Sequence, residues 1–201
     1  MGPSYRAVSE ATPGDILEQT PTLRDAVFSG MTLDTFNRHS EKVAMANCAQ
    51  LINCLNSLYL ADEDRFVVTP VGRVFEIYTS HQGNQAVRTM IAAPQVHYDR
   101  DGKPATFWGL QGSASIADKK LVLTVVNPHV IERRLTEIAI RGAAGKSGTV
   151  TTLTSPDIHA HNTFAEPNAL VPKTDSVNVK GSTLVHEFPP ASVSALQIEL
   201  V

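Results

Sequence analysis

Residues 22–53 constrain the fold of this chain more than any other stretch, because they open with a strong signal for an amphipathic helix. Thr22 is followed three residues later by Asp25, which is the spacing of a capping box, and Pro21 stops any preceding helix. Apolar side chains then recur at helical spacing on roughly one face: Leu23, Ala26, Val27, Met31, Leu33 and Phe36. The charged residues fall largely on other faces: Arg24, Asp25, Asp34 and Arg38. We predict a helix that ends near His39.

The second half of this stretch is apolar without a helical or an alternating pattern. Residues 43–52 read VAMANCAQLI, which is too continuously apolar for a strand with one face in solvent. Such runs are typical of strands buried on both faces, as in a parallel α/β sheet or barrel. The sequence therefore predicts a buried strand over residues 43–52.

These residues also resemble a known family. The segment LRDAVFSGMTLDTFNRHSEKVAMANCAQLIN is similar to the segment that follows the catalytic nucleophile in α-L-arabinofuranosidases of glycoside hydrolase family 51, which typically reads close to LRDAL, FNRH and VKMANIAQLVN. Two further stretches resemble the family in the same order. VVTPVGRVFEIYTSHQG is similar to its last barrel helix, and SPDIHAHNTFAEPNAL to a loop of its C-terminal sandwich. The resemblance extends from about Leu17 onward.

The resemblance implies a mixed fold, in which the last βα units of a (β/α)8 barrel precede an all-β, jelly-roll-like C-terminal sandwich. It also implies a retaining glycosidase that uses two carboxylates about 5 Å apart. Neither family motif stands in this sequence: there is no Glu-Trp-Gly for the nucleophile and no Asn-Glu pair for the acid/base. Glu10 and Glu18 precede the helix without the strand or aromatic neighbours that the nucleophile motif requires. We therefore expect no catalytic residue here, a chain that begins just downstream of the chemistry, and no activity in isolation.

A second helix and a change of character define the predicted domains. Thr69-Pro70 is a good helix start, and apolar residues follow at helical spacing as far as Gly83. From Asn84 onward, short β-rich runs alternate with turn residues. We predict a first domain over residues 1–83, with an N-terminal loop (1–21) and the final βα elements of a partial barrel. A C-terminal β-sandwich domain is predicted over residues 84–201.

Seven strands are predicted in the second domain, some of which alternate apolar and polar residues as expected for sheets with one buried face. Their ranges are 86–98, 121–127, 135–141, 148–154, 176–180, 183–188 and 194–200. Turns are predicted at residues 99–102 and 180–182.

Composition argues against several classes of partner. The net charge is −3 and no Lys/Arg cluster exceeds two residues, so we expect no nucleic acid and no anionic membrane surface as partner. No apolar run approaches the roughly 18 to 20 residues that span a bilayer, and the first residues lack the apolar core of a signal peptide, so we expect a cytoplasmic protein. The only cysteines, Cys48 and Cys54, are predicted to be a buried reduced pair.

Two motifs resemble nucleotide or metal sites. Residues 142–147, GAAGKS, end like a phosphate-binding loop, but Ile140 stands where the first glycine belongs and a predicted strand follows. His159 and His161 with Asp157 could begin a zinc site, although no third and fourth ligand is evident and a loop with local hydrogen bonds is the favoured interpretation. We expect no metal and no cofactor.

Two further features have a functional and a structural interpretation, and we favour the structural one. Residues 62–64, Asp-Glu-Asp, lack the ligand spacing of a calcium loop and are predicted to be a solvated turn. Trp108 could be a sugar-stacking platform on an exposed sheet, but a lone tryptophan in a strand is more often part of a core.

Gln50 is the candidate site residue. It lies near the C-terminal end of the predicted strand, where (β/α)8 barrels bind their substrates, and its amide can both donate to and accept from a sugar hydroxyl. By resemblance, the family's glutamine at this motif position contacts the arabinofuranosyl ring beside the nucleophile. The alternative is a glutamine satisfied by backbone groups inside the barrel. Asn47 and Asn53, three residues to either side, are predicted to point away and to serve packing.

The hypothesis is therefore the C-terminal part of a retaining exo-α-L-arabinofuranosidase. The complete enzyme would release terminal L-arabinofuranosyl groups from arabinan, arabinoxylan or their oligosaccharides. Its expected protein partner is the missing N-terminal half of the barrel or a second copy of the chain. The alternative is a non-catalytic β-sandwich module for structural packing or oligomer assembly, and a third is a truncated gene product with no function of its own.

Overall fold

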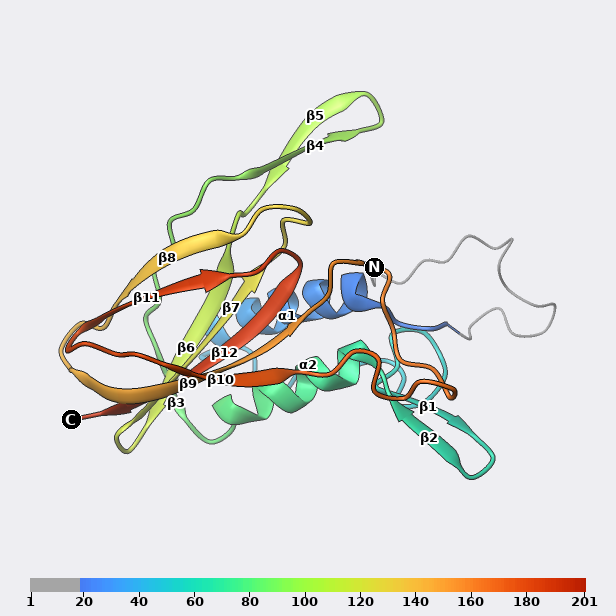
Figure 1. Cartoon of the computed structure of the whole chain (residues 1–201), viewed down its shortest axis with the longest axis horizontal. Coiled ribbons are helices and arrows are strands. Elements are labelled where there is room, and N and C mark those ends of the chain that lie inside the picture. The colour runs from blue at the N-terminus through green and yellow to red at the C-terminus, as the bar shows by residue number, and fades with distance from the viewer. Residues whose placement is uncertain (1–18) are drawn as a thin grey trace.

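The computed structural model describes residues 19–201, and it is a mostly β structure with two helices (Figure 1). Glu10 and Glu18 lie outside the described residues. A six-stranded antiparallel sheet has the order β10-β9-β12-β7-β6-β3, and three strand pairs stand apart from it: β1-β2, β4-β5 and β8-β11. The strands are β1 (Tyr59–Asp62), β2 (Arg65–Val68), β3 (Gln85–Val87), β4 (Val96–Arg100), β5 (Lys103–Phe107), β6 (Gln111–Ala117), β7 (Lys120–Asn127), β8 (Arg134–Ala139), β9 (Gly145–Thr154), β10 (Lys173–Val177), β11 (Thr183–Phe188) and β12 (Ser192–Leu200).

Helix α1 (Leu23–Arg38) confirms the helix predicted from the capping box and the apolar spacing. The backbone N–H of Thr22 donates to Asp25 Oδ2 at 2.8 Å, and the Thr22 hydroxyl donates to the same oxygen at 3.0 Å. These bonds satisfy a donor that the first turn cannot pair within the helix. His39 forms the C-terminal cap, where the helix was predicted to end.

Helix α2 (Pro70–Tyr78) begins at the predicted position but is shorter than predicted, because a single 3-10 turn over Thr79–His81 replaces its last residues. The Thr69 hydroxyl accepts from the Gly72 N–H at 3.0 Å and donates to the Ser57 carbonyl at 2.7 Å. The helix packs closely on the chain before it, since a Cβ on Gly72 would lie 2.3 Å from the Leu58 carbonyl oxygen. Thr69 therefore both caps α2 and ties it to the loop that precedes β1.

Thr69→Ala should lower the free energy of unfolding by about 1 to 2 kcal/mol, because a buried cap and a second buried hydrogen bond are lost together. Urea unfolding of the two proteins measures the difference. Thr79→Ala is the matched control, since the exposed Thr79 hydroxyl only bonds back to the Glu76 carbonyl of its own helix. A loss in Thr69→Ala no larger than that in Thr79→Ala would show that the buried Thr69 cap contributes no more than an exposed hydroxyl.

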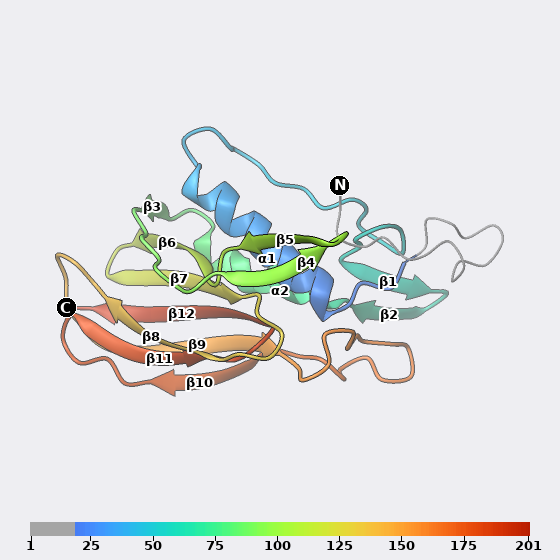
Figure 2. The same cartoon turned by 90° about the horizontal axis from the view of Figure 1, so that it is seen from above.

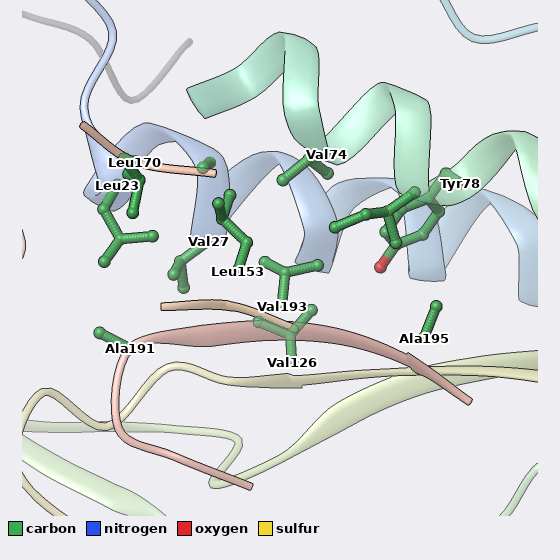
Figure 3. Close-up of a cluster of buried hydrophobic side chains, with 12 residues drawn as sticks. Leu23, Val27, Val74, Tyr78, Val126, Leu153, Leu170, Ala191, Val193 and Ala195 are labelled. Carbon is green, nitrogen blue, oxygen red and sulfur yellow. The ribbon is translucent and has the colours of Figure 1, made fainter. Parts of the chain in front are cut away.

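The six-stranded sheet has apolar layers on both faces, which the alternation of β12 makes visible. Val193 and Ala195 lie in the layer shared with the helices, and Leu196 and Ile198 in the layer shared with β8 and β11. Figure 3 shows the first layer, where side chains of both helices meet those of β7, β9 and β12. Each face of the sheet therefore buries its own cluster, and α1 and α2 are held on one of them.

The strand predicted over residues 43–52 is wrong. After α1, residues 39–58 run back along the outside of the helix to the β1-β2 hairpin (Figure 2) without a strand, although Ile52 forms an isolated bridge with Tyr59. Met45 is 75% exposed and Leu51 58% exposed. A strand buried on both faces needs hydrogen-bonded neighbours and covering layers. Within residues 19–201 nothing supplies them, so the apolar run stays irregular.

The predicted strands of the second half are largely confirmed, with shifts of a few residues at their ends. The range 86–98 is wrong as one strand, because residues 88–95 leave the sheet and separate β3 from β4. Four strands were not predicted: β1, β2, β5 and β6. The turn predicted at residues 62–64 is the tip of the β1-β2 hairpin, and the turn at 99–102 joins β4 to β5.

Candidate functional site

Gln50 lies in the connection between α1 and β1, with its side chain exposed. Its backbone N–H donates to the Cys54 carbonyl at 3.1 Å, which closes a turn over these residues. Leu51 and Ile52 beside it are exposed as well. The amide of Gln50 is therefore presented on an apolar, uncovered segment, where it is free to donate to or accept from a ligand.

The connection that holds Gln50 is anchored by hydrogen bonds rather than by strand pairing. Asn56 Nδ2 donates to Ser29 Oγ on α1 at 3.1 Å, and the Asn56 N–H donates to the Ala49 carbonyl at 3.1 Å. The Cys48 thiol donates to the Asn56 carbonyl at 2.8 Å. Cys48 and Cys54 are free and half-buried, in agreement with the predicted reduced pair except that their burial is incomplete. Partial burial raises the pKa of the Cys48 thiol.

Asp34 is the buried carboxyl that the sequence did not reveal. It was expected on the polar side of α1, but it is fully buried against the sheet. Its Oδ1 accepts from Ser113 Oγ at 2.7 Å and from Thr124 Oγ1 at 2.5 Å, while Oδ2 accepts no hydrogen bond within residues 19–201. Burial raises the pKa of Asp34 to about 7, and the nearby hydroxyls and Arg38 only partly oppose the shift.

His81 continues the same polar cluster toward the surface. Its Nε2 lies 3.0 Å from Thr124 Oγ1 and its Nδ1 lies 2.7 Å from Ser115 Oγ. Because Thr124 gives its one proton to Asp34, it must accept from His81, which fixes the Nε2–H tautomer and makes Nδ1 an acceptor. Burial lowers the pKa of His81 to about 4, so the ring is neutral near pH 7.

This cluster joins α1 to the sheet and is closed to a ligand. Its hydroxyls come from β6 and β7, and its carboxyl is fully buried between helix and strand. The sequence signal that could have identified it is the alternation of Ser113 and Ser115 on β6, which places two hydroxyls on one face of a strand. The cluster is therefore structural.

The structure places His159, His161 and residues 142–147 in the loop and strand positions that the sequence predicted. His159 and His161 lie in a loop with local bonds: Asp157 Oδ1 accepts from the His159 N–H at 2.9 Å, and His161 Nδ1 lies 2.9 Å from the His159 carbonyl. Residues 142–147 run into β9 and not into a helix. Within residues 19–201 no group of three His, Cys, Asp or Glu side chains is placed to hold a metal ion.

The expectation that Trp108 belongs to a core is wrong, because its side chain is 63% exposed. It follows the β4-β5 hairpin, which projects from the rest of the chain (Figure 1). This two-stranded ribbon stands apart from the main sheet, and Tyr98 packs edge-on against Phe107 within it at 5.6 Å. An apolar residue at the end of such a ribbon has no second layer to enter.

A hollow of about 650 Å³ lies away from Gln50, between the 3-10 turn, the β6-β7 turn and the end of β12. Ser80, Asn84, Lys120 and Glu199 contribute to its polar lining. Gln50 is not among the residues that line it, so the candidate residue and the hollow are separate features. Neither of the two helices in the described part of the chain has the length and apolar composition that crossing a membrane requires.

Comparison with known proteins supports one family. The family model described as the α-L-arabinofuranosidase C-terminal domain matches residues 4–192. Among curated proteins, the chain is 26% identical over 191 residues to an intracellular exo-α-L-arabinofuranosidase of Bacteroides ovatus, covering 93% of this chain and 37% of that protein.

Solved structures agree with this match. The chain superimposes on the GH51 arabinofuranosidase from Xanthomonas axonopodis pv. citri with a TM-score of 0.85 at 28% identity, over 97% of this chain and 39% of that one. For an α-L-arabinofuranosidase from Thermotoga maritima in complex with arabinose, the TM-score is 0.81 at 30% identity, over 92% of this chain and 40% of that one. The chain thus spans about two fifths of the length of these relatives.

Proposed function

Because this chain belongs to the α-L-arabinofuranosidase C-terminal domain family of glycoside hydrolase family 51, we propose that it is the C-terminal part of a retaining exo-α-L-arabinofuranosidase. The complete enzyme would release terminal L-arabinofuranosyl groups from arabinan, arabinoxylan and their oligosaccharides. The observation that supports this best is the superposition of 97% of this chain on 39% of a solved GH51 arabinofuranosidase. The relative from Bacteroides ovatus is described as intracellular, which supports a cytoplasmic location.

In this proposal the chemistry belongs to the other part of the enzyme. Retaining hydrolysis uses one carboxyl group as nucleophile and another as acid/base, about 5 Å apart. This chain contains neither family motif for those groups. It would contribute Gln50, whose exposed amide can bond a hydroxyl of the arabinofuranosyl ring that sits beside the nucleophile. No cofactor takes part.

The apolar segment around Gln50 indicates where the rest of the enzyme would attach. Met45, Leu51 and Ile52 are exposed. Covering these apolar side chains with neighbouring strands would lower the free energy of the assembly. We assign residues 1–83 to an N-terminal loop and the final βα elements of a partial barrel, and residues 84–201 to the C-terminal sandwich. The N-terminal half of the barrel is then the expected partner of the segment that holds Gln50.

Gln50→Ala tests the proposed role in the assembled enzyme. The variant should lower kcat/KM by roughly tenfold to a hundredfold, because a buried hydrogen bond to the sugar is worth about 1.5 to 3 kcal/mol. His159→Ala, in an exposed loop, should leave the kinetics nearly unchanged. Full kcat/KM in Gln50→Ala, with the assembly intact by sedimentation, would remove Gln50 from the site.

A second candidate function, assembly through the β-sandwich, is favoured by one surface. Ile131, Leu135 and Val185 are exposed on or beside β8 and β11. Exposed apolar side chains of this kind are found at protein interfaces, and here Glu137 and Glu187 lie on the same face of the strand pair. In that case the chain would form a stable oligomer by sedimentation without the catalytic part, and Leu135→Lys would dissociate it while leaving arabinofuranosidase activity of the complete enzyme in place.

A further inference from the structure

Asn53 holds the connection after Gln50 onto the first strand by its side chain. Asn53 Nδ2 donates to the Ala61 carbonyl at 2.9 Å, and Asn53 Oδ1 accepts from the Ala61 N–H at 2.8 Å. The Asn53 backbone N–H also donates to the Tyr59 carbonyl at 3.0 Å. The side-chain amide of Asn53 thus bonds both the backbone N–H and the carbonyl of Ala61, as the backbone of a neighbouring strand would do in a sheet. The Asn53 side chain therefore continues along β1 the pairing that the Ile52–Tyr59 bridge begins.

The backbone of Asn53 explains why an asparagine serves here. Its φ of 60° lies in the left-handed region, which asparagine tolerates better than most residues. Aspartate would keep the acceptor but lose the donor to the Ala61 carbonyl, and glycine would keep the backbone conformation but lose both bonds. Each replacement thus removes a defined part of the anchor.

A second anchor follows Asn53 in the chain. Asn53 bonds β1, and Asn56 bonds Ser29 of α1 and the carbonyl of Ala49, next to Gln50. The backbone bond from Gln50 to Cys54 closes the turn in which Asn53 lies. Ser29 lies on α1, which packs on the six-stranded sheet, and Ala61 lies on the separate β1-β2 hairpin, so the two anchors tie the backbone around Gln50 to both elements.

We propose that Asn53 is a positioning residue for Gln50: its paired bonds to Ala61 hold the turn so that the Gln50 amide meets the arabinofuranosyl ring in one orientation. This inference rests on the proposed function for its substrate. Asn47 offers a matched control, because it is also three residues from Gln50 but its side chain is exposed. The two asparagines, which the sequence predicts to serve packing alike, therefore differ.

The first measurement uses the chain alone and does not depend on activity. In Asn53→Gly, amide hydrogen exchange measured by NMR should be about tenfold faster than in the wild type at both Ala61 and Gln50. In Asn53→Asp, exchange at Gln50 should increase by less. Asn47→Gly should leave both amides as they are in the wild type. Unchanged exchange of Gln50 in Asn53→Gly would overturn the proposed anchor.

The second measurement is a double-mutant cycle in the assembled, active enzyme. Asn53→Gly should lower kcat/KM by about fivefold to tenfold, since small misplacements of a contacting group are costly. In the Gln50→Ala background the same change should cost less than about twofold, because a residue that acts through Gln50 has nothing left to position. If the losses in kcat/KM of the two single variants multiply in the double variant, Asn53 acts independently of Gln50. Its role would then be purely structural, and the proposal would be overturned. An assembly with no activity would count against the proposed function instead, and the exchange experiment would then decide on Asn53.

Discussion

The purified chain on its own is expected to release no measurable nitrophenol from p-nitrophenyl α-L-arabinofuranoside. Glycosidic hydrolysis requires an acid that protonates the leaving oxygen and a nucleophile on the other side of the sugar, and the loss of either lowers the rate by orders of magnitude. The carboxyl with the most strongly raised pKa, Asp34, is enclosed between α1 and the sheet and cannot reach a sugar. The chain should therefore match the buffer blank.

A residual rate in this assay requires a control for contaminating enzymes. Asp34→Asn provides one, because it removes a carboxyl without altering the exposed surface. Turnover that follows the chain through rigorous purification and disappears in a variant of one of its own residues would contradict the expected inactivity. A rate shared equally by wild type and Asp34→Asn, and lost on further purification, would come from another protein.

The largest effect on stability is expected from pH, through two groups whose contributions oppose each other. Burial raises the pKa of Asp34 from 3.8 to about 7, so over this range the folded chain keeps a proton that the unfolded chain has released. The stability linked to Asp34 is therefore full below about pH 4 and falls as pH rises toward 7, by on the order of 4 kcal/mol. Burial lowers the pKa of His81 from 6.5 to about 4, so its contribution is full above pH 6.5 and is lost as pH falls toward 4.

Single variants should separate these two slopes. Asp34→Asn leaves His81 alone to titrate, so the free energy of unfolding should rise with pH between about 4 and 6.5. His81→Gln leaves Asp34, so the free energy of unfolding should fall over the same range. The exposed Asp175→Asn on β10 is the control and should follow the wild type. Guanidinium unfolding at a series of pH values measures all four proteins, and a pH profile for Asp34→Asn parallel to that of the wild type would refute the buried, protonated state of Asp34.

The helices could be predicted from the sequence because their signals are local. The capping box at Thr22 and the Thr-Pro pair before α2 bond within a few residues of chain, so distant neighbours do not alter them. Strand β12 was also predictable, since apolar and polar residues alternate over its second half. The expectation of one buried face is wrong for this strand, because Val193 and Ala195 bury its other face against the helices.

The remaining features depend on parts of the molecule that a local pattern does not contain. The apolar run at residues 43–52 has the composition of a buried strand, but a strand forms only where neighbours pair with it. Strand β6 was missed for the opposite reason: Ser113 and Ser115 make it polar, and they are buried because Asp34 and His81 meet them from other elements. Trp108 was misplaced because nothing local shows that its hairpin leaves the sheet.

In the candidate site, too, some residues could be identified from the local sequence and others only from the structure. Gln50 could be named from the resemblance of its motif, whereas the anchors at Asn53 and Asn56 become visible only when Ala61 and Ser29 are located beside them. The exposed apolar segment around Gln50 is consistent with a surface that the other part of a complete enzyme covers.

The central claim is that this chain completes an arabinofuranosidase whose catalytic carboxylates lie outside it, and complementation tests it most directly. The chain is mixed with a separately purified polypeptide that carries the earlier barrel strands and both catalytic glutamates, and hydrolysis of p-nitrophenyl α-L-arabinofuranoside is followed against each part alone. Neither part should be active by itself, and the mixture should form a complex by sedimentation and hydrolyse the substrate, with the rate reduced by Gln50→Ala and not by Asn47→Ala. A stable complex without activity, or full activity of the catalytic polypeptide in the absence of this chain, would contradict the claim.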